Sequence, residues 1–364
     1  MDNNSSQDWK LKLNHLLKKL SIEDRYRCVA GIPGPILEMR SGTLPRELAR
    51  CKRISDFTRL IADITCLELR KLRKYAKKIA DEYSFVKVFR KYNAITNDLR
   101  SCLILLEDYI RAFIHSLRGF SVISNPVNIN KIREIQLCIH NQIINITYPA
   151  DLVSLGLLWE IFAEEIYFFD KPVKCIYDLG ANIGFSAVYF HVLNPATELI
   201  CVEPMEENIQ ILKRNLNSNN INAKIIPVAV GNTEGKITLF FGDQSHALPS
   251  VNTKQPQAKQ VSILPLNKII NGKEYGLKID IEGAERFLGQ YPAIIENADW
   301  IVGELHYSGD IERDSQIDTF FDIVKRNFTV AKGRPIIYFV GDEVLLCETF
   351  KTLNKIPKHN SLGD

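Results

Sequence analysis

The sequence predicts an α/β fold with a doubly wound, Rossmann-like sheet that ends in an antiparallel hairpin and follows a helical N-terminal region. From about residue 175, short apolar strands alternate with helical patterns. The first of these strands leads into a glycine-rich turn, Gly180 to Gly184, and Glu203 ends the second strand. A turn of this kind, between a strand and a helix, is where an open α/β sheet binds a nucleotide-like ligand.

Composition and charge indicate a folded protein made of two units. The chain has 364 residues, a net charge of +3 and 8 cysteines without a C-x-x-C pair. Residues 1–120 hold 24 Lys and Arg against 14 Asp and Glu, whereas the remainder holds 22 against 29. We therefore expect a basic helical domain over 1–122, a linker over 123–134, a second domain over 135–350 and a tail over 351–364.

The start of the chain and its hydropathy predict a cytoplasmic protein. The start of the chain does not resemble a signal peptide, and no apolar run approaches the roughly 20 residues of a membrane span. A basic helix over 69–79 could bind an anionic glycan, lipid headgroups or nucleic acid, but Tyr75 is its only aromatic residue. We therefore favour a solvated helix face, and we expect a small-molecule partner rather than nucleic acid.

Hydrophobic periodicity and turn residues give the expected order of elements. Expected helices cover 7–20, parts of 45–119, 151–169, a segment after Gly184, 209–216, a segment from about 284, and 312–326. Expected strands cover 134–139, 143–147, 175–178, 198–202, 224–228, 236–241, 277–280, 300–303, 336–340 and 343–347. A polar loop is expected over 242–260.

The residues of the glycine turn favour S-adenosylmethionine over a dinucleotide. The spacing is D-x-G-x-x-x-G, which puts Asp178 at a strand tip where it would repel a pyrophosphate. A ligand with an ammonium, a sulfonium and no phosphate suits that acid. Glu203 stands where a carboxylate can grip two ribose hydroxyls. The ordinary alternative is a strand, turn and helix that bind nothing.

Four motifs occur in a specific order along the chain. They are Asp178-Leu-Gly-Ala-Asn-Ile-Gly184, Val202-Glu-Pro204, Val228-Ala-Val-Gly231 and Leu277-Lys-Ile-Asp-Ile-Glu-Gly-Ala-Glu285. Together they closely resemble the FkbM-type S-adenosylmethionine-dependent methyltransferases, which generally methylate hydroxyl oxygens of sugars and polyketides. The resemblance covers about residues 135–350 and implies the class I methyltransferase sheet.

The resemblance also implies cofactor contacts at the ends of successive strands. The methionine half would lie against Asp178, Gly180 and Gly184, the ribose against Glu203, and the adenine edge against Ala229 and Val230. We also expect Asn182, in the same turn, to contact the cofactor.

Methyl transfer to a neutral hydroxyl also needs a positioned base or a metal. Asp280 ends one expected strand, and Glu304 and His306 end the next, so these side chains should converge. His306 is the first candidate base, and His246, in the polar loop, is the second. Asp280, Glu304 and His306 could instead bind Mg²⁺ or Mn²⁺, although we favour the metal-free version because these ligands alone do not define a metal's geometry.

For two further acids an ordinary role competes with a functional one. Glu282 and Glu285 open an expected helix, where acidic side chains are favourable in any case. The sequence thus predicts an O-methyltransferase that acts on a hydroxyl of a sugar or glycoconjugate. Two alternatives are a methyltransferase-like adaptor that holds a partner with its basic helices, and an NAD-dependent dehydrogenase, which Asp178 disfavours.

Overall fold

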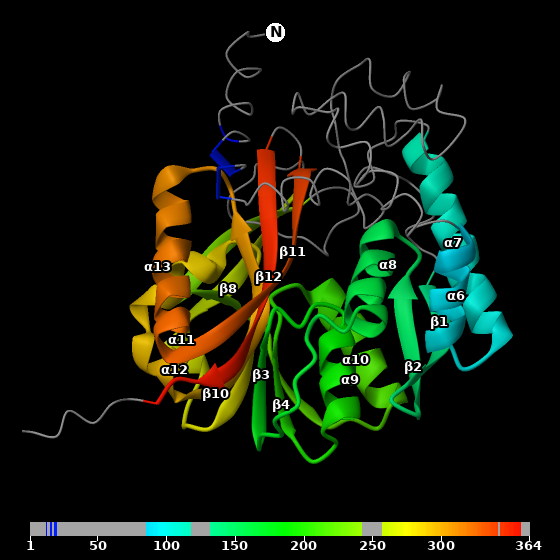
Figure 1. The fold of residues 1–364 in the computed structure, drawn as a ribbon, viewed down its shortest axis with the longest axis horizontal. Coiled ribbons are helices and arrows are strands. Elements are labelled where there is room, and N and C mark those ends of the chain that lie inside the picture. Colours follow the sequence, from blue (N-terminus) through cyan, green and yellow to red (C-terminus); the bar gives the residue numbers. More distant parts are fainter. Residues whose placement is uncertain are drawn as a thin grey trace, which may run out of the picture.

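The computed structural model describes residues 85–117, 132–241, 257–340 and 343–357, together with residues 12, 15, 16, 18 and 19. The central strands are β3 (Cys175–Leu179), β4 (Glu198–Val202), β5 (Ala223–Ile226), β9 (Tyr275–Ile279), β10 (Ala298–Tyr307), β11 (Phe328–Val340) and β12 (Glu343–Lys355). They form a seven-stranded sheet in the order β11-β12-β10-β9-β3-β4-β5 (Figure 1). Strands β3, β4, β5, β9 and β10 are parallel, and β12 and β11 add antiparallel pairs at one edge.

Helices cover both faces of this sheet. They include α9 (Phe185–Leu193), α10 (Glu206–Ser218), α11 (Leu266–Ile269), η2 (Ala284–Gln290, a 3₁₀-helix), α12 (Pro292–Asn297) and α13 (Ile311–Asn327). In Figure 1, α9 and α10 lie on one side of the sheet, and α11, α12 and α13 on the other. This is the doubly wound arrangement, which requires strands that are apolar on both faces.

Strand β3 shows how the sequence meets that requirement. Successive side chains of a strand point to opposite faces. Accordingly, Ile176 packs in the hydrophobic cluster on the α9 side, whereas Tyr177 and Leu179 pack in the cluster on the α13 side. The strand can therefore lie in the middle of the sheet and bring the turn that follows it to the sheet's carboxyl edge.

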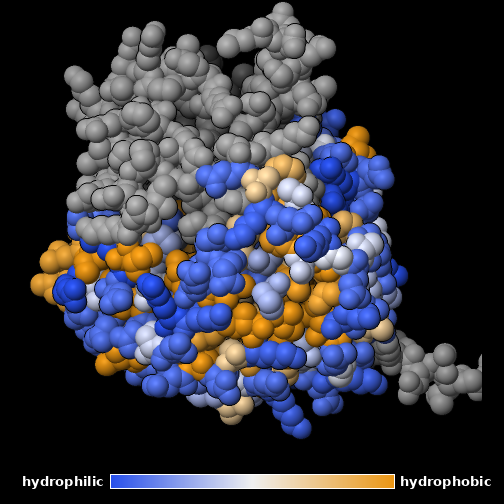
Figure 2. Space-filling model, turned by 180° about the vertical axis from the view of Figure 1, so that it is seen from behind, coloured by the Kyte–Doolittle hydropathy of each residue, from blue (hydrophilic) through white to orange (hydrophobic). Residues whose placement is uncertain are grey.

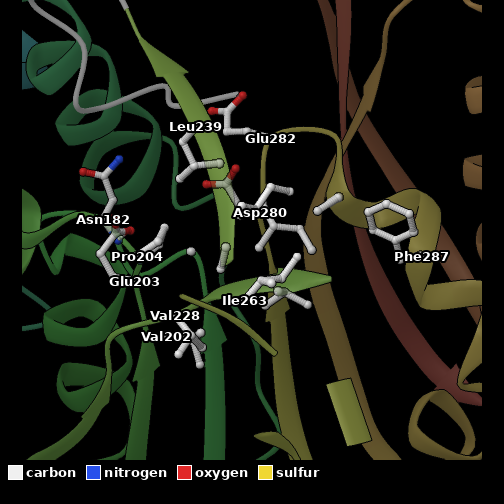
Figure 3. Close-up of a pocket in the computed structure, with 16 residues that line it drawn as sticks. Asn182, Val202, Glu203, Pro204, Val228, Leu239, Ile263, Asp280, Glu282 and Phe287 are labelled. Carbon is white, nitrogen blue, oxygen red and sulfur yellow. Dashed lines mark hydrogen bonds between the residues drawn. The ribbon is translucent and has the colours of Figure 1, made fainter. Parts of the chain in front are cut away.

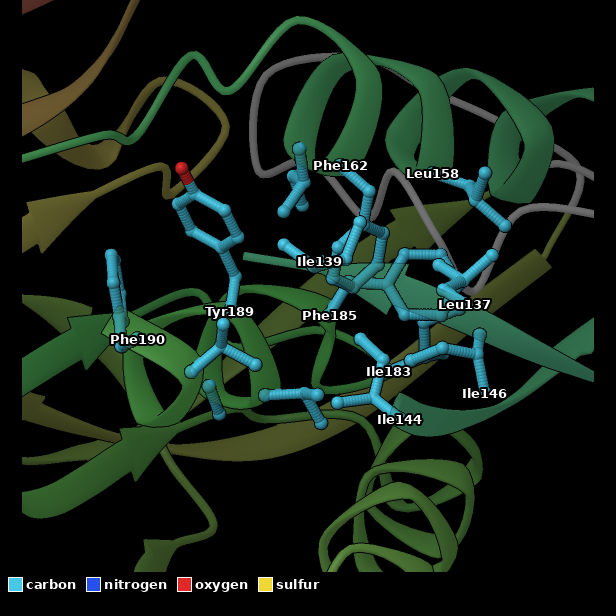
Figure 4. Packing of buried hydrophobic residues seen from close by; sticks show 14 of the residues in the cluster. Leu137, Ile139, Ile144, Ile146, Leu158, Phe162, Ile183, Phe185, Tyr189 and Phe190 are labelled. Carbon is cyan, nitrogen blue, oxygen red and sulfur yellow. The ribbon is translucent and has the colours of Figure 1, made fainter. Parts of the chain in front are cut away.

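A two-stranded hairpin covers the α9 side. Its strands are β1 (Ile132–Ile139) and β2 (Gln142–Pro149), and its two-residue turn, His140 and Asn141, has φ of 47° and 63°. Two positive φ values match the twist of a tight hairpin. Figure 4 shows Leu137, Ile139, Ile144 and Ile146 of the hairpin in one cluster with Phe185 and Tyr189 of α9. The hairpin thus belongs to the core that supports the glycine turn.

Two more helices pack against this hairpin. They are α6 (Phe85–Ile95) and α7 (Leu99–Leu117), and Tyr92 and Leu105 of these helices are buried in the same cluster. Asp108 of α7 accepts hydrogen bonds from Arg133 Nε at 3.0 Å and from the Tyr148 hydroxyl at 2.9 Å. The division of the chain at residue 122 stays a prediction, because the rest of the expected basic domain lies outside the described residues.

A smaller, three-stranded sheet lies beside the main one, in the order β6-β8-β7. Its strands are β6 (Ala229–Gly231), β7 (Gly235–Phe241) and β8 (Gln257–Pro265). The expected polar loop over 242–260 is wrong for its last four residues, which pair with β7 from Thr238 to Phe241. These residues are polar because β8 leaves most of their side chains in solvent, while their backbone still pairs.

The expected helix over 151–169 is also shorter than the pattern predicts. An α-helix, α8 (Leu152–Leu158), continues as a π-helix, η1 (Trp159–Ala163), and the chain then leaves the helix. Tertiary packing overrides the helical pattern there: Phe169 stacks on Trp300 with ring centroids 4.2 Å apart, and Tyr167 is buried. Strand β1 begins at residue 132, inside the expected linker, and β12 ends at residue 355, inside the expected tail.

Figure 2 shows hydrophilic residues over much of the face opposite to that of Figure 1, with hydrophobic patches between them. Leu99 and Ile311 are the most exposed large hydrophobic residues of the part described, at 62% and 72%. Within that part, no helix combines the length and the apolar character needed to cross a membrane.

Candidate active site

A pocket lies at the carboxyl ends of β3, β4 and β9, where an open α/β sheet places its ligands. Its lining consists of Gly180, Asn182, Val202, Glu203, Pro204, Val228, Ala229, Val230, Ile237, Leu239, Ile263, Asp280, Ile281, Glu282, Ala284 and Phe287. Figure 3 shows Asn182, Glu203 and Pro204 together, apart from Asp280 and Glu282. Of the predicted site residues, Asp178, Gly184, Glu304 and His306 lie outside this lining, and His246 lies outside the described residues.

The glycine turn has the backbone that the sequence predicts. Gly180 has φ of +78°, and a Cβ at this position would lie 1.7 Å from the backbone oxygen of Asp280. Gly184 has φ of +90° and directly precedes α9, where a Cβ would lie 2.5 Å from Leu212 Cδ1. Both positions therefore need glycine, for their left-handed backbone and for the close approach of neighbouring chain.

Glu203 is held in place by the chain on both sides of the turn. Its Oε1 accepts hydrogen bonds from Met205 N at 2.9 Å and Asn208 Nδ2 at 3.1 Å, and its Oε2 accepts from Asn182 N at 3.0 Å. Burial raises the pKa of Glu203 to about 7 against the effect of these donors. The carboxylate is therefore oriented, and Oε2, with a single described donor, has capacity for a ligand hydroxyl.

Asp178 does not face the pocket. Its side chain has no exposed surface, Ser186 Oγ donates to its Oδ2 at 2.6 Å, and Lys278 Nζ lies 3.3 Å from its Oδ1. Burial raises the pKa of Asp178, and the charge of Lys278 opposes that shift. Asp178 therefore does not repel a pyrophosphate from the pocket, contrary to the sequence-based expectation, because its charge is paired inside the protein. Direct contact with the cofactor stays a prediction that its position does not support.

Lys278 is a buried residue to which sequence reasoning assigned no role. Its ammonium donates to Gly180 O at 2.6 Å and lies 3.3 Å from both Asp178 and Asp280. Burial alone would lower the pKa of Lys278, but the charges of Asp280, Asp178 and Glu304 raise it above its ordinary value. The signal was present in the sequence, as a lysine between two apolar residues of a short strand.

An acid–histidine cluster adjoins the pocket and consists of Asp280, Glu282, Glu285, Glu304 and His306. His306 Nε2 lies 3.9 Å from Asp280 Oδ1, 3.7 Å from Glu282 Oε2 and 3.7 Å from Glu304 Oε2. Its Nδ1 is hydrogen-bonded to Glu285 Oε1 at 3.0 Å. Glu304 and His306 lie within β10 rather than after it, and they share a face of the sheet because they are two residues apart.

The charges of this cluster argue against His306 as a general base. Burial alone would lower its pKa, but the carboxylates of Glu282, Glu285 and Asp280 raise it well above the ordinary value. An imidazolium has no free lone pair with which to accept a proton. Burial also raises the pKa of Glu282 to about 8, although His306 opposes that shift. Glu285 contributes to the raised pKa of His306 because its carboxylate is fully buried against the imidazole. It is therefore not the solvated acid at a helix N-terminus that its ordinary role would require.

Tyr167 is a further member of the site that the sequence did not reveal. Its hydroxyl donates to Glu304 Oε1 at 2.8 Å, and the same oxygen lies 3.2 Å from Asp280 Oδ2. The Cys347 thiol donates to Glu304 Oε2 at 2.8 Å. No sequence signal identified Tyr167, because it lies in a stretch whose pattern predicted a continuous helix. Its contacts fix the two acids with respect to each other.

Comparison with known proteins agrees with these motifs. Residues 178–313 match the family model described as the methyltransferase FkbM domain. No curated protein shows significant similarity to the chain.

Several solved structures resemble the chain at low identity. M. jannaschii TYW2 in complex with AdoMet is 13% identical over 61% of this chain and 87% of its own, with a TM-score of 0.34. P. horikoshii TYW2 in complex with MeSAdo is 12% identical over 60% of this chain and 71% of its own, with a TM-score of 0.33. A methyltransferase from Pyrococcus furiosus is 11% identical over 58% and 90%, with a TM-score of 0.29. Similarity at this level does not bear on substrate or mechanism. The family match does bear on identity: residues 178–313, which are less than half of the chain, are similar to the methyltransferase FkbM domain.

Proposed function

We propose that this chain is an S-adenosylmethionine-dependent O-methyltransferase that acts on a hydroxyl of a sugar or glycoconjugate. The charge of the pocket carries the choice of cofactor. Its described lining contains three carboxylic acids, Glu203, Asp280 and Glu282, and no lysine, arginine or histidine. A dinucleotide would bring a doubly charged diphosphate to these acids with no cation to compensate it. The sulfonium and ammonium of S-adenosylmethionine complement them.

The arrangement of the lining supports one orientation of the cofactor. Glu203 Oε2 is placed to accept a hydrogen bond from a ribose hydroxyl, next to the glycine turn. Ala229 and Val230 face an apolar wall formed with Leu239, which suits the flat, weakly polar adenine ring. The methionine part would then extend past Gly180 toward Asp280. This orientation brings the reactive methyl group to the acid–histidine cluster.

The chemistry is an in-line displacement at the methyl carbon. The acceptor oxygen forms the new C–O bond while the C–S bond breaks, and the C–S electron pair stays on sulfur to give S-adenosylhomocysteine. The proton of the acceptor hydroxyl passes to a carboxylate oxygen of Asp280, which lines the pocket. Asp280 is favoured over His306 because His306 faces acids on both of its nitrogens.

The acceptor class is supported by the groups at the same end of the pocket. Asp280 and Glu282 can accept hydrogen bonds from neighbouring hydroxyls of a polyol, and Phe287 offers a ring to its apolar face. A cofactor-binding adaptor is the second candidate from the sequence, but its expected basic helix over 69–79 lies outside the described residues.

Binding and turnover together test the proposal. Calorimetry should show that the chain binds S-adenosylmethionine and does not bind NAD, and incubation with methyl-labelled cofactor should transfer label to members of a saccharide and glycoconjugate panel. Asp280→Asn should lower kcat by about 10²–10⁴-fold without a matching loss of cofactor affinity. Glu234→Gln is a matched control, since its side chain is 66% exposed. Binding of NAD but not of S-adenosylmethionine would overturn the proposal, and binding without transfer to any acceptor would favour the adaptor.

A further inference from the structure

We infer that Asp280, Glu282 and His306 bind an oxygen-preferring divalent cation, of the Mn²⁺ and Mg²⁺ class, beside the site of methyl transfer. Asp280 follows β9, Glu282 lies in the turn after it, and His306 is on β10, the neighbouring strand. One ligand atom from each of the three lies within 4.8 Å of the other two. The inference rests on the proposed function for the role of the ion in catalysis, but not for its binding.

The spacing around His306 Nε2 is that of ligands around a shared ion. Nε2 lies 3.9 Å from Asp280 Oδ1 and 3.7 Å from Glu282 Oε2, too far for hydrogen bonds. Two atoms that each bind one ion at about 2.1 Å can be at most about 4.2 Å apart. Both distances are inside that limit. The His306 side chain is only 5% exposed, and its Nε2 points at the carboxylates of Asp280 and Glu282 without forming a hydrogen bond to either.

The other ring nitrogen gives independent support for an ion. A histidine that binds a metal almost always has its second nitrogen on a carboxylate or carbonyl, which fixes the tautomer. Here Glu285, which has no exposed surface, holds His306 Nδ1 at 3.0 Å and also accepts a hydrogen bond from Ile281 N at 3.1 Å. That contact keeps a proton on Nδ1 and points Nε2 at the pocket acids, so an ion would bind Nε2 by displacing the second proton of the imidazolium.

Charge balance points the same way. Four carboxylic acids surround His306, and Lys278 lies 3.3 Å from one of them, Asp280, as well as from Asp178. These acids outnumber the two basic side chains, and a divalent cation would offset two of the carboxylates. Two carboxylates with a single imidazole suit Mn²⁺ or Mg²⁺ better than the thiolate-rich sets typical of zinc.

A second possible group, Glu304, His306 and Cys347, is the weaker candidate. None of its members lines the pocket, and Cys347 already donates to Glu304. The first group has two members in the pocket, so its ion would reach the acceptor. Coordination would make the acceptor hydroxyl more acidic and orient its oxygen toward the methyl group. In that arrangement the hydroxyl proton leaves to water instead of Asp280, and the methyl transfer is otherwise as described above.

The test measures Mn²⁺ binding directly, on the full chain and without cofactor. After treatment with chelator and its removal, titration with Mn²⁺ followed by electron paramagnetic resonance should show one bound ion per chain. Glu282→Gln and Asp280→Asn should each weaken binding at least about tenfold, whereas Glu234→Gln should bind like the wild type. Glu282→Gln keeps the shape of a partly exposed side chain, so its fold is expected to persist.

Thermal unfolding separates an ion site from an internally neutralised cluster. Mn²⁺ should raise the Tm of the wild type and not that of Glu282→Gln, because only the wild type keeps the complete ligand set. Absence of binding at millimolar Mn²⁺, or equal binding by wild type and both variants, would overturn the inference. Calorimetry of S-adenosylmethionine in chelator keeps the two proposals apart, since cofactor binding without Mn²⁺ binding would refute the ion alone.

Discussion

Glu203→Gln is the sharpest single test of the cofactor site. The amide oxygen can still accept from Met205 N and Asn208 Nδ2, so most of the internal hydrogen bonds survive. The amide nitrogen, however, takes the place of Oε2, where Asn182 N already donates at 3.0 Å. The ribose loses a charged acceptor, and such a hydrogen bond contributes about 1.5–3 kcal/mol. We therefore expect the Kd for S-adenosylmethionine to rise about 10- to 150-fold by calorimetry.

The control for this experiment is Glu234→Gln, which makes the same chemical change on an exposed side chain. Glu203→Ala should also weaken binding at least about tenfold, but it removes the acceptor of three internal hydrogen bonds and so tests stability as well. An unchanged Kd in a folded Glu203→Gln protein would refute the assignment of the ribose contact.

The pKa of Glu203 gives the same residue a second readout. Because the ionised carboxylate is the stronger acceptor for the ribose hydroxyl, a pKa of about 7 predicts that cofactor affinity rises about fivefold from pH 6 to pH 7. The pKa is higher in the folded chain than the ordinary 4.5, so Glu203 lowers stability by about 3 kcal/mol as the pH rises through that interval. Urea unfolding at pH 5 and pH 8 should show this loss in the wild type and not in Glu203→Gln. A parallel pH dependence in both proteins would contradict it.

Three further predictions follow from the packing around the site. Gly180→Ala should lower the Tm more than Gly184→Ala, because its Cβ would meet backbone at 1.7 Å whereas that of Gly184 first meets a movable side-chain carbon at 2.5 Å; equal losses would contradict this. Lys278→Met should cost about 3–5 kcal/mol in urea unfolding, since it leaves two acids uncompensated, and adding Asp178→Asn should recover part of that loss. A chain that begins near Ser124 should aggregate or lose cofactor binding, because this truncation removes α6 and α7, which pack in the same core as the hairpin. A stable monomer with full cofactor affinity would show that the region after residue 124 folds independently.

The fold could be predicted as far as local pattern and tertiary structure agree. β3 and β4 are short, apolar and bounded by turns, and both were predicted close to their observed limits. The pattern failed where packing or pairing decides. Tyr167 and Phe169 leave a helix-like stretch because their rings find buried partners on β10. The polar residues of β8 pair through their backbone, which side-chain hydrophobicity does not report.

The site was predictable to the extent that its residues end successive parallel strands. The topology alone brings Glu203, after β4, and Asp280, after β9, to one edge, and both line the pocket. The partner of each acid could not be predicted, because partners come from segments distant in the sequence. Glu285 illustrates this: its position at a helix start favoured an ordinary role, and only the neighbouring strand supplies the histidine that it holds.

Asp178 has a different role in the structure from the one that the sequence predicts. The acid was expected to select the cofactor by its own charge, yet it lies behind the turn and anchors Lys278. Lys278 then binds Gly180 O and approaches Asp280, so one buried ammonium ties β3, the glycine turn and the end of β9 together. The ion pair of Asp178 and Lys278 fixes the position of the turn, and its two charges balance each other. The acids that line the pocket are instead Glu203, Asp280 and Glu282, at the two ends where ribose and acceptor are expected. Selection of a cationic cofactor is in this way separated from the ion pair that holds the turn, and neutralising Asp178 should affect folding more than cofactor charge preference.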